Sequence, residues 1–94
     1  MIKINEIIPK YCEVIPEKII NGYLYIVLNE TAIHLCACGC GVETVTPLSP
    51  PDNWTLMDVD NKVTLRPSIG NFKSETPKYH AHYYITENKI VWCA

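Results

Sequence analysis

The chain of 94 residues is poor in arginine and lacks any long apolar run. Arg66 is its single arginine, and its net charge at pH 7 is −2. Nucleic-acid-binding domains usually carry clustered lysine and arginine for phosphate contacts, so this composition argues against a nucleic-acid partner. No stretch approaches the ~18 uninterrupted apolar residues of a membrane-spanning helix. Residues 1–11 also lack the apolar region and cleavage site of a signal peptide, so we expect a cytoplasmic protein.

Recognisable catalytic motifs are missing as well. The sequence contains no nucleophile elbow, no glycine-rich phosphate loop and no H-E-x-x-H motif of a metalloprotease. Three acidic residues that could act as a general base follow no spacing typical of one: Glu43, Glu75 and Glu87. The sequence therefore favours a non-enzymatic role over catalysis.

What the sequence does contain is a series of short segments with the period of a β-strand. Aromatic and β-branched residues alternate with polar ones between turn residues, which is typical of strands. The predicted strands are 22–29, 31–37, 42–46, 54–59, 62–67, 78–86 and 89–94. We predict a mainly β fold: one domain, residues 1–94, built as an antiparallel sheet or sandwich of about six or seven short strands.

The connections follow from turn residues and prolines. Two-residue turns are predicted at 29–30, 60–61 and 87–88, and three prolines exclude 47–53 from a sheet interior. Residues 68–77 are predicted to form a loop. The segment 15–22 is open to two interpretations: one helical turn capped by Gly22, or a turn or short 3₁₀ segment.

Three closely spaced cysteines are the main chemical feature. Cys36, Cys38 and Cys40 lie on alternate positions, and a glycine follows each of the last two. In a reducing compartment, clustered cysteines more often bind a metal than form disulfides. Zinc takes four nitrogen or sulfur ligands, usually from two chain segments. His80 and His82 supply the second segment, because residues two apart on a regular strand project from the same face.

We therefore predict one structural zinc ion that staples the domain through four of these five residues. Cys38 and Cys40 are the first choice of thiolates because glycines frame them, whereas Cys36 is the ligand most readily left out. His34 lies on the same strand face as Cys36 if the alternation is regular. It is a further candidate ligand, but we expect it to be a core histidine or one that supports a zinc ligand. The two remaining cysteines, Cys12 and Cys93, stand alone in apolar stretches and are predicted to be structural.

Several blocks of the sequence resemble a bacterial family of small zinc-binding proteins. The blocks are "HLCACGCG", "TPLSP", "RPSIGN", "HAHYYI" and "KIVWCA", and together they cover about residues 11 to 94. They are similar to the family pattern H-L-C-x-C-G-C-G, P-L-S-P, P-S-I-G-N, C-x-S-H-Y and a final V-x-W. In the block C-x-S-H-Y, the family cysteine falls on His80 of this chain and the family histidine falls on His82. The resemblance therefore implies a Cys₃His zinc site in the relatives and a Cys₂His₂ site here.

The resemblance also carries a functional implication. Some members of that family are encoded beside ubiquitin-like proteins, their activating enzymes and deubiquitinase-like peptidases. The leading hypothesis is therefore a zinc-stabilised module that binds another protein in a ubiquitin-like conjugation pathway. Ser68, Asn71 and Trp54 are its candidate binding residues, although a purely structural role of the "SIGN" segment is the competing interpretation. The alternatives are a metal-dependent hydrolase with an open zinc position and a zinc-dependent nucleic-acid-binding module.

Overall fold

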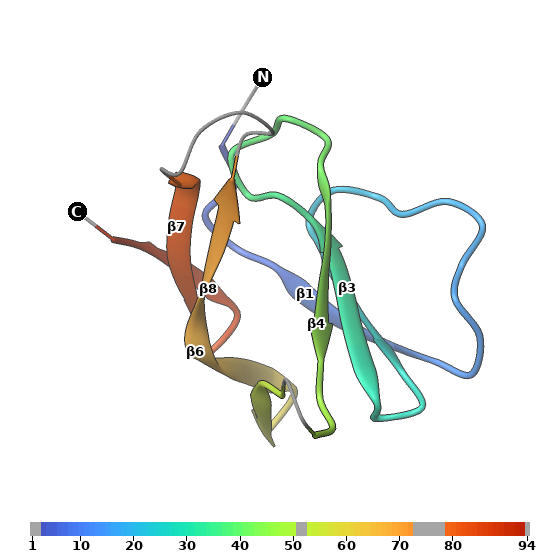
Figure 1. Ribbon diagram of the computed structural model, residues 1–94. Coiled ribbons are helices and arrows are strands. Elements are labelled where there is room, and N and C mark those ends of the chain that lie inside the picture. The colour runs from blue at the N-terminus through green and yellow to red at the C-terminus, as the bar shows by residue number, and fades with distance from the viewer. Residues whose placement is uncertain (1–2, 51–52, 73–78, 94) are drawn as a thin grey trace.

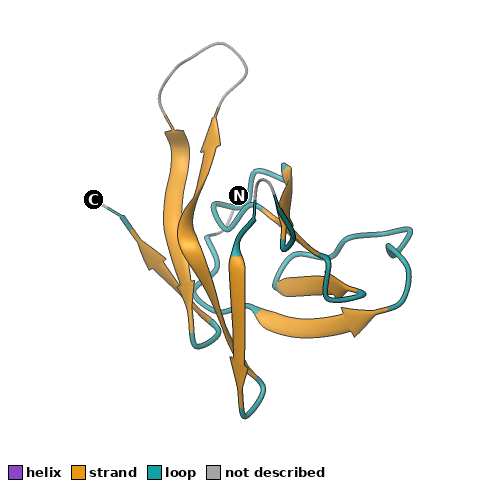
Figure 2. Ribbon diagram, turned by 60° about the horizontal axis from the view of Figure 1, so that its bottom comes forward, coloured by secondary structure: helices purple, strands orange, loops and turns teal. Residues whose placement is uncertain are grey.

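Eight strands form two four-stranded sheets in the computed structural model (Figure 1). The structure describes residues 3–50, 53–72 and 79–93, and for Phe72, Tyr79 and His80 it describes the backbone alone. The described residues contain no helix, as Figure 2 shows. None of them therefore forms a helix long and apolar enough to cross a membrane. The prediction of a mainly β fold is confirmed.

The first sheet has the strand order β1-β2-β3-β4. Its strands are β1 (Ile8–Cys12), β2 (Tyr23–Val27), β3 (Thr31–Leu35) and β4 (Glu43–Pro47). β2, β3 and β4 pair antiparallel, in agreement with the sequence. The sequence did not predict β1, which pairs with β2 in parallel. Pro9 and the uneven polarity of this segment hide its period. No helix forms over 15–22, which is an irregular connection between the two parallel strands (Figure 2).

The second sheet is an antiparallel meander, β5-β6-β7-β8. Its strands are β5 (Thr55–Val59), β6 (Lys62–Phe72), β7 (Tyr79–Thr86) and β8 (Lys89–Trp92). Asp60 and Asn61 both have positive φ, as do Glu87 and Asn88, so both predicted two-residue turns are confirmed. This backbone twist matches that of the flanking antiparallel strands, and aspartate and asparagine tolerate it better than most residues.

The prediction of a loop over 68–77 is wrong for its first part. Residues 68–72 continue β6, and residues 73–77 lie outside the described segments. Leu65 pairs with Ile85 and Ile69 with Tyr83, so four steps along β6 match two steps along β7. β6 therefore bulges between Leu65 and Ile69. A bulge lets turn-type residues such as Pro67 stay within a strand, which is why their composition was misleading.

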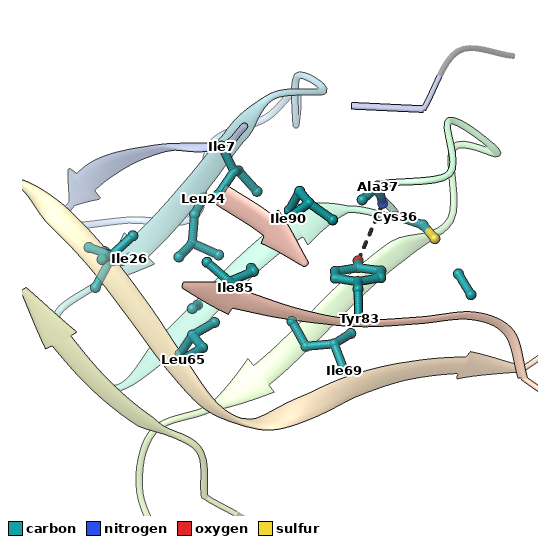
Figure 3. Packing of buried hydrophobic residues seen from close by; sticks show 13 residues of the cluster. Ile7, Leu24, Ile26, Cys36, Ala37, Leu65, Ile69, Tyr83, Ile85 and Ile90 are labelled. Carbon is teal, nitrogen blue, oxygen red and sulfur yellow. Dashed lines mark hydrogen bonds between the residues drawn. The ribbon is translucent and has the colours of Figure 1, made fainter. Parts of the chain in front are cut away.

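The inner faces of the two sheets supply one apolar core (Figure 3). Buried side chains from β2 meet those from β6, β7 and β8, together with Ile7 ahead of β1. The largest of them are Ile7, Leu24, Ile26, Leu65, Ile69, Tyr83 and Ile85. The chain also links the sheets before β1, because Ile7 donates to the carbonyl of Asn88 at 2.8 Å. The outer face of each sheet is thereby left for other contacts.

Replacing Ile85 by alanine tests this core. Ile85 is fully buried, so Ile85→Ala should lower the free energy of unfolding by about 2–5 kcal/mol through lost burial and the remaining cavity. Chemical denaturation measures the change. Val14→Ala is the control, because Val14 is 74% exposed and should change stability by less than about 0.5 kcal/mol. Equal losses in the two variants would contradict the assignment of the core.

Candidate functional site

The three clustered cysteines lie in a short loop between β3 and β4. Their Sγ atoms are all within 4.8 Å of one another, and those of Cys36 and Cys38 are 3.4 Å apart. Ligands ~2.3 Å from a tetrahedral zinc ion would place sulfur atoms ~3.8 Å apart. The donor set and its spacing therefore fit a metal, and Cys36, which the sequence ranked last, belongs to the group. Three close cysteines could hold a metal ion.

Backbone contacts close this loop. Cys36 N donates to the Val42 carbonyl at 2.8 Å, and Gly39 N donates to the Cys36 carbonyl at 3.0 Å. Gly39 and Gly41 have φ of 88° and 85°, values that residues with a Cβ rarely adopt. The glycines thus allow the chain to turn twice within a few residues. Such turns direct three successive thiols toward one point.

The loop is anchored to the opposite sheet by Tyr83. The Ala37 N–H donates to the Tyr83 hydroxyl at 3.3 Å, beside the sulfur of Cys36 (Figure 3). The same hydroxyl shares a 2.6 Å hydrogen bond with His34 Nε2. Since Tyr83 belongs to β7 and His34 to β3, one phenol connects both sheets and the cysteine loop. Cys12 and Cys93 lie outside the cluster and are half-buried.

Burial keeps both partners of this hydrogen bond uncharged. It lowers the pKa of His34 to about 4 and raises the pKa of Tyr83 above its usual range. Nearby Cys36 adds to the rise of the Tyr83 pKa. Nδ1 of His34 is buried without a hydrogen-bond partner. His34 is thus a fully buried neutral core histidine, one of the two roles expected from the sequence.

A serine and a histidine meet on the outer face of the second sheet. Ser68 Oγ lies 2.9 Å from His82 Nε2, and both residues are half-buried. Along β7, Ala81, Tyr83 and Ile85 face the core, so His82 points away from it. Ser68 lies in the bulged part of β6, two residues before the cross-strand partner of His82, and reaches this imidazole diagonally. A serine hydroxyl at hydrogen-bond distance from an imidazole is the arrangement of a nucleophile and its general base.

Neighbouring residues fix the serine in place. Trp54 Nε1 donates to the Ser68 carbonyl at 3.4 Å, and its ring packs against the core. Gly70 is the cross-strand partner of His82, and because glycine has no side chain, this partner places none beside the imidazole. Asn71 turns toward the other sheet, where its Oδ1 accepts a hydrogen bond from Thr44 at 3.2 Å. Asn71 Nδ2 is buried without a partner.

The predicted metal ligands are thus divided between two places. The cysteines form one group, and His82 Nε2 lies 2.9 Å from Ser68 Oγ. His80 lies where β7 gains a residue relative to β6, since Asn71 pairs with Ala81 and Phe72 with Tyr79. This shift interrupts the regular alternation from which both imidazoles were expected on one face. The side chain of His80 lies outside the described part, and the two histidines stay predicted ligands.

An open groove continues the sheet face that carries Ser68 and His82. It has a volume of about 590 Å³ and is lined by Asn53, Thr55, Arg66, Pro67, Tyr84, Thr86 and Val91. Pro67 directly precedes Ser68, and Tyr84 is the next residue after His82 on that face of β7. The groove is therefore adjacent to the serine–histidine pair and large enough for a short peptide segment.

Both members of the pair were predicted to be functional residues, but in other roles. Ser68 was a candidate binding residue and His82 a candidate metal ligand. No motif joins two residues 14 positions apart, and the pairing of β6 with β7 that brings them together has no clear sequence signature. The groove was missed entirely, although the single arginine of an acidic chain stands in it.

A protein-family model matches most of the chain. A family model described as "Bacterial ubiquitination-like system serine protease (BubE)" matches residues 11–93. The chain belongs to the BubE family. No curated protein and no solved structure gives a match. Membership confirms the resemblance to a family associated with ubiquitin-like conjugation. It also supports an accessory role in a bacterial ubiquitination-like system.

Replacing Tyr83 by phenylalanine tests the link between this sheet and the cysteine loop. Tyr83→Phe keeps the ring but leaves His34 Nε2 and Ala37 N buried without their partner, so the free energy of unfolding should fall by about 1–3 kcal/mol. Chemical denaturation measures it. Tyr84→Phe removes a hydroxyl from the exposed neighbour and should have an effect below about 0.5 kcal/mol. A neutral Tyr83→Phe would show that the bridge is dispensable.

Proposed function

We propose that the chain is a serine hydrolase that cleaves a peptide or isopeptide bond in a bacterial ubiquitination-like system. Ser68 is the nucleophile and His82 is the general base. The 2.9 Å contact between Ser68 Oγ and His82 Nε2 carries this proposal. The description of the family as a serine protease supports it independently.

The bond changes and proton transfers of the proposed reaction use these two side chains and water. Ser68 Oγ attacks the carbonyl carbon of the scissile bond while His82 Nε2 accepts the hydroxyl proton. As the C–N bond breaks, His82 returns that proton to the leaving amine, and an ester on Ser68 remains. Water, deprotonated in turn by His82, hydrolyses the ester and regenerates the hydroxyl. The half-buried position of the pair lets a substrate approach while limiting its contact with water.

The protein partner expected from the sequence becomes the substrate in this proposal. A ubiquitin-like protein, or a target joined to one, supplies an amide bond at an exposed chain end. Trp54 donates a hydrogen bond to the Ser68 carbonyl, so it is assigned a role in positioning Ser68 rather than in direct recognition. Asn71 contacts Thr44 of the opposite sheet and is likewise assigned to the scaffold.

Zinc is the ion that we assign to the cysteine loop. Three thiolates suit zinc in the reducing cytoplasm that the sequence predicts, and a nitrogen from His80 would complete a closed tetrahedral site. His82 is then left to Ser68. A closed structural zinc adds on the order of 10 kcal/mol of apparent binding energy, which is comparable with the whole stability of a small domain. Its role here is to hold the loop that meets Tyr83.

A fluorophosphonate probe tests the serine hydrolase directly. Such probes react with serines activated by a base, so the wild type should be labelled once, on Ser68, as read by mass spectrometry of the peptides. Ser68→Ala should abolish labelling, and His82→Ala should slow it at least ~10³-fold. Cleavage of a ubiquitin-like protein carrying a C-terminal extension should fall in parallel.

The control for this experiment is the exposed serine of the proline-rich connection. Ser49→Ala should leave both labelling and cleavage unchanged, because Ser49 lies outside the site. An unlabelled wild type, or equal labelling of Ser68→Ala, would overturn the proposed chemistry. Cleavage that survives Ser68→Ala but stops with a chelator would favour a metal-dependent hydrolase instead.

Metal analysis separates the two histidines. Protein purified without added metal should contain about one zinc per chain, and Cys38→Ser or His80→Ala should lower this content and the unfolding midpoint. His82→Ala should keep its zinc while losing fluorophosphonate labelling. His34→Ala should also retain zinc. Loss of zinc in His82→Ala with retention in His80→Ala would make His82 the fourth ligand and remove it from the role of base.

A further inference from the structure

The groove beside Ser68 and His82 contains a cation that the proposed chemistry does not use. Arg66 lines it, two residues before Ser68 on β6, opposite Tyr84 and Thr86 of β7. Arg66 and Ser68 both lie in the bulged part of β6, where four steps match two steps of β7, so they are at most about two residues of extended substrate apart, at about 3.3 Å per residue. A bound peptide whose carbonyl reaches Ser68 therefore places a nearby side chain at this guanidinium.

Contacts on several sides fix the guanidinium. Nη1 donates to the carbonyls of Leu65 and Ile85 at 2.8 and 3.2 Å, and Nη2 donates to Thr86 Oγ1 at 3.0 Å. Its Cζ lies 4.7 Å from the centroid of the Tyr84 ring, which holds it by a cation–π contact. A long side chain held in this way loses little conformational freedom when a ligand binds, so ligand binding is correspondingly stronger.

The guanidinium keeps capacity for a further partner. An arginine has five N–H donors, and these contacts use three of them. None of the seven residues that line the groove is acidic, although the chain as a whole is. A fixed guanidinium with two remaining donors is well suited to a carboxylate, because the hydrogen bonds to it are charge-assisted.

We infer that the groove binds an acidic side chain of the substrate close to the scissile bond, and that Arg66 is the residue that sets this preference. The inference rests on the proposed function for its substrate, a peptide segment that reaches Ser68. It adds a specificity that neither the serine–histidine pair nor family membership supplies. The aromatic ring of Tyr84 and the edge of Pro67 form the apolar walls on which the stem of a glutamate or aspartate lies.

A positional-scanning library of decapeptides tests the preference. Each peptide carries a single Glu, Gln or Lys at one position of a Gly/Ala/Ser/Leu background, and both kcat and KM of cleavage are measured. The wild type should prefer Glu to Gln about tenfold at one position, mainly through KM, since the contact is already present in the bound substrate. Higher ionic strength should weaken the preference. No preference for Glu over Gln at any position would overturn the inference.

Variants distinguish recognition from a structural role. Arg66→Gln should abolish the preference at that position, and Arg66→Glu should reverse it in favour of Lys. A change that only loosened the sheet would lower cleavage of all peptides equally and would refute the assignment. Lys10→Gln is the matched control, because Lys10 also stacks on a tyrosine, Tyr23, but in the other sheet. It should leave the preference unchanged.

A binding measurement keeps this test separate from the proposed chemistry. Fluorescence anisotropy with Ser68→Ala protein and the same labelled peptides needs no turnover. Tighter binding of the Glu peptide than of its Gln match, lost in Ser68→Ala/Arg66→Gln, supports the acidic subsite even if the wild type fails to react with a fluorophosphonate. Equal binding of the two peptides by Ser68→Ala protein, together with fluorophosphonate labelling of the wild type on Ser68, refutes the subsite and leaves the serine hydrolase standing.

Discussion

The hydroxyl of Tyr83 is the contact on which the rest of the structure depends. It lies between the two sheets, bonds to His34 of β3 and accepts from Ala37 in the cysteine loop. All three groups are buried, so none can find water as a replacement partner if the phenol moves. The position of β7 is therefore coupled to the conformation of a loop on the opposite sheet. A metal held by that loop would stabilise β7 through the same oxygen.

Alternation along β7 puts the structural residue Tyr83 and the proposed base His82 on opposite faces of the strand. Tyr83 faces the core and the loop, whereas its neighbour His82 faces the outer surface and Ser68. Continuing the pairing of Leu65 with Ile85 without a bulge would set Ser68 directly opposite His82. The two extra residues of the bulge instead place Gly70 opposite His82 and Ser68 diagonal to it, at the cost of a local break in the sheet ladder. The geometry of the pair is thus a property of strand pairing, which is more rigid than a loop.

The sequence was informative about local structure and much less so about how the strands combine. Alternation and turn residues predicted β2 to β5, β7, β8 and the first part of β6, because a half-buried strand alternates apolar and polar residues; the second part of β6 was predicted to be a loop. They missed β1, whose parallel pairing with β2 leaves no turn signal nearby. Glycine spacing predicted the cysteine group, since all three thiols come from one segment. The Ser68–His82 contact could not be predicted, because it requires the register between two strands, and the sequence of the bulge looks like a loop.

A site built on strands also determines where specificity can come from. Ser68 and His82 lie on the outer face of a sheet, and the residues two positions away along the same strands are Arg66 and Tyr84. Strand period two places all four on one face, despite the bulge, as their shared contacts and the groove show. The other face of this sheet is committed to the core. The proposed recognition and catalysis would therefore share the outer faces of β6 and β7, where the guanidinium of Arg66 lines the groove beside the pair.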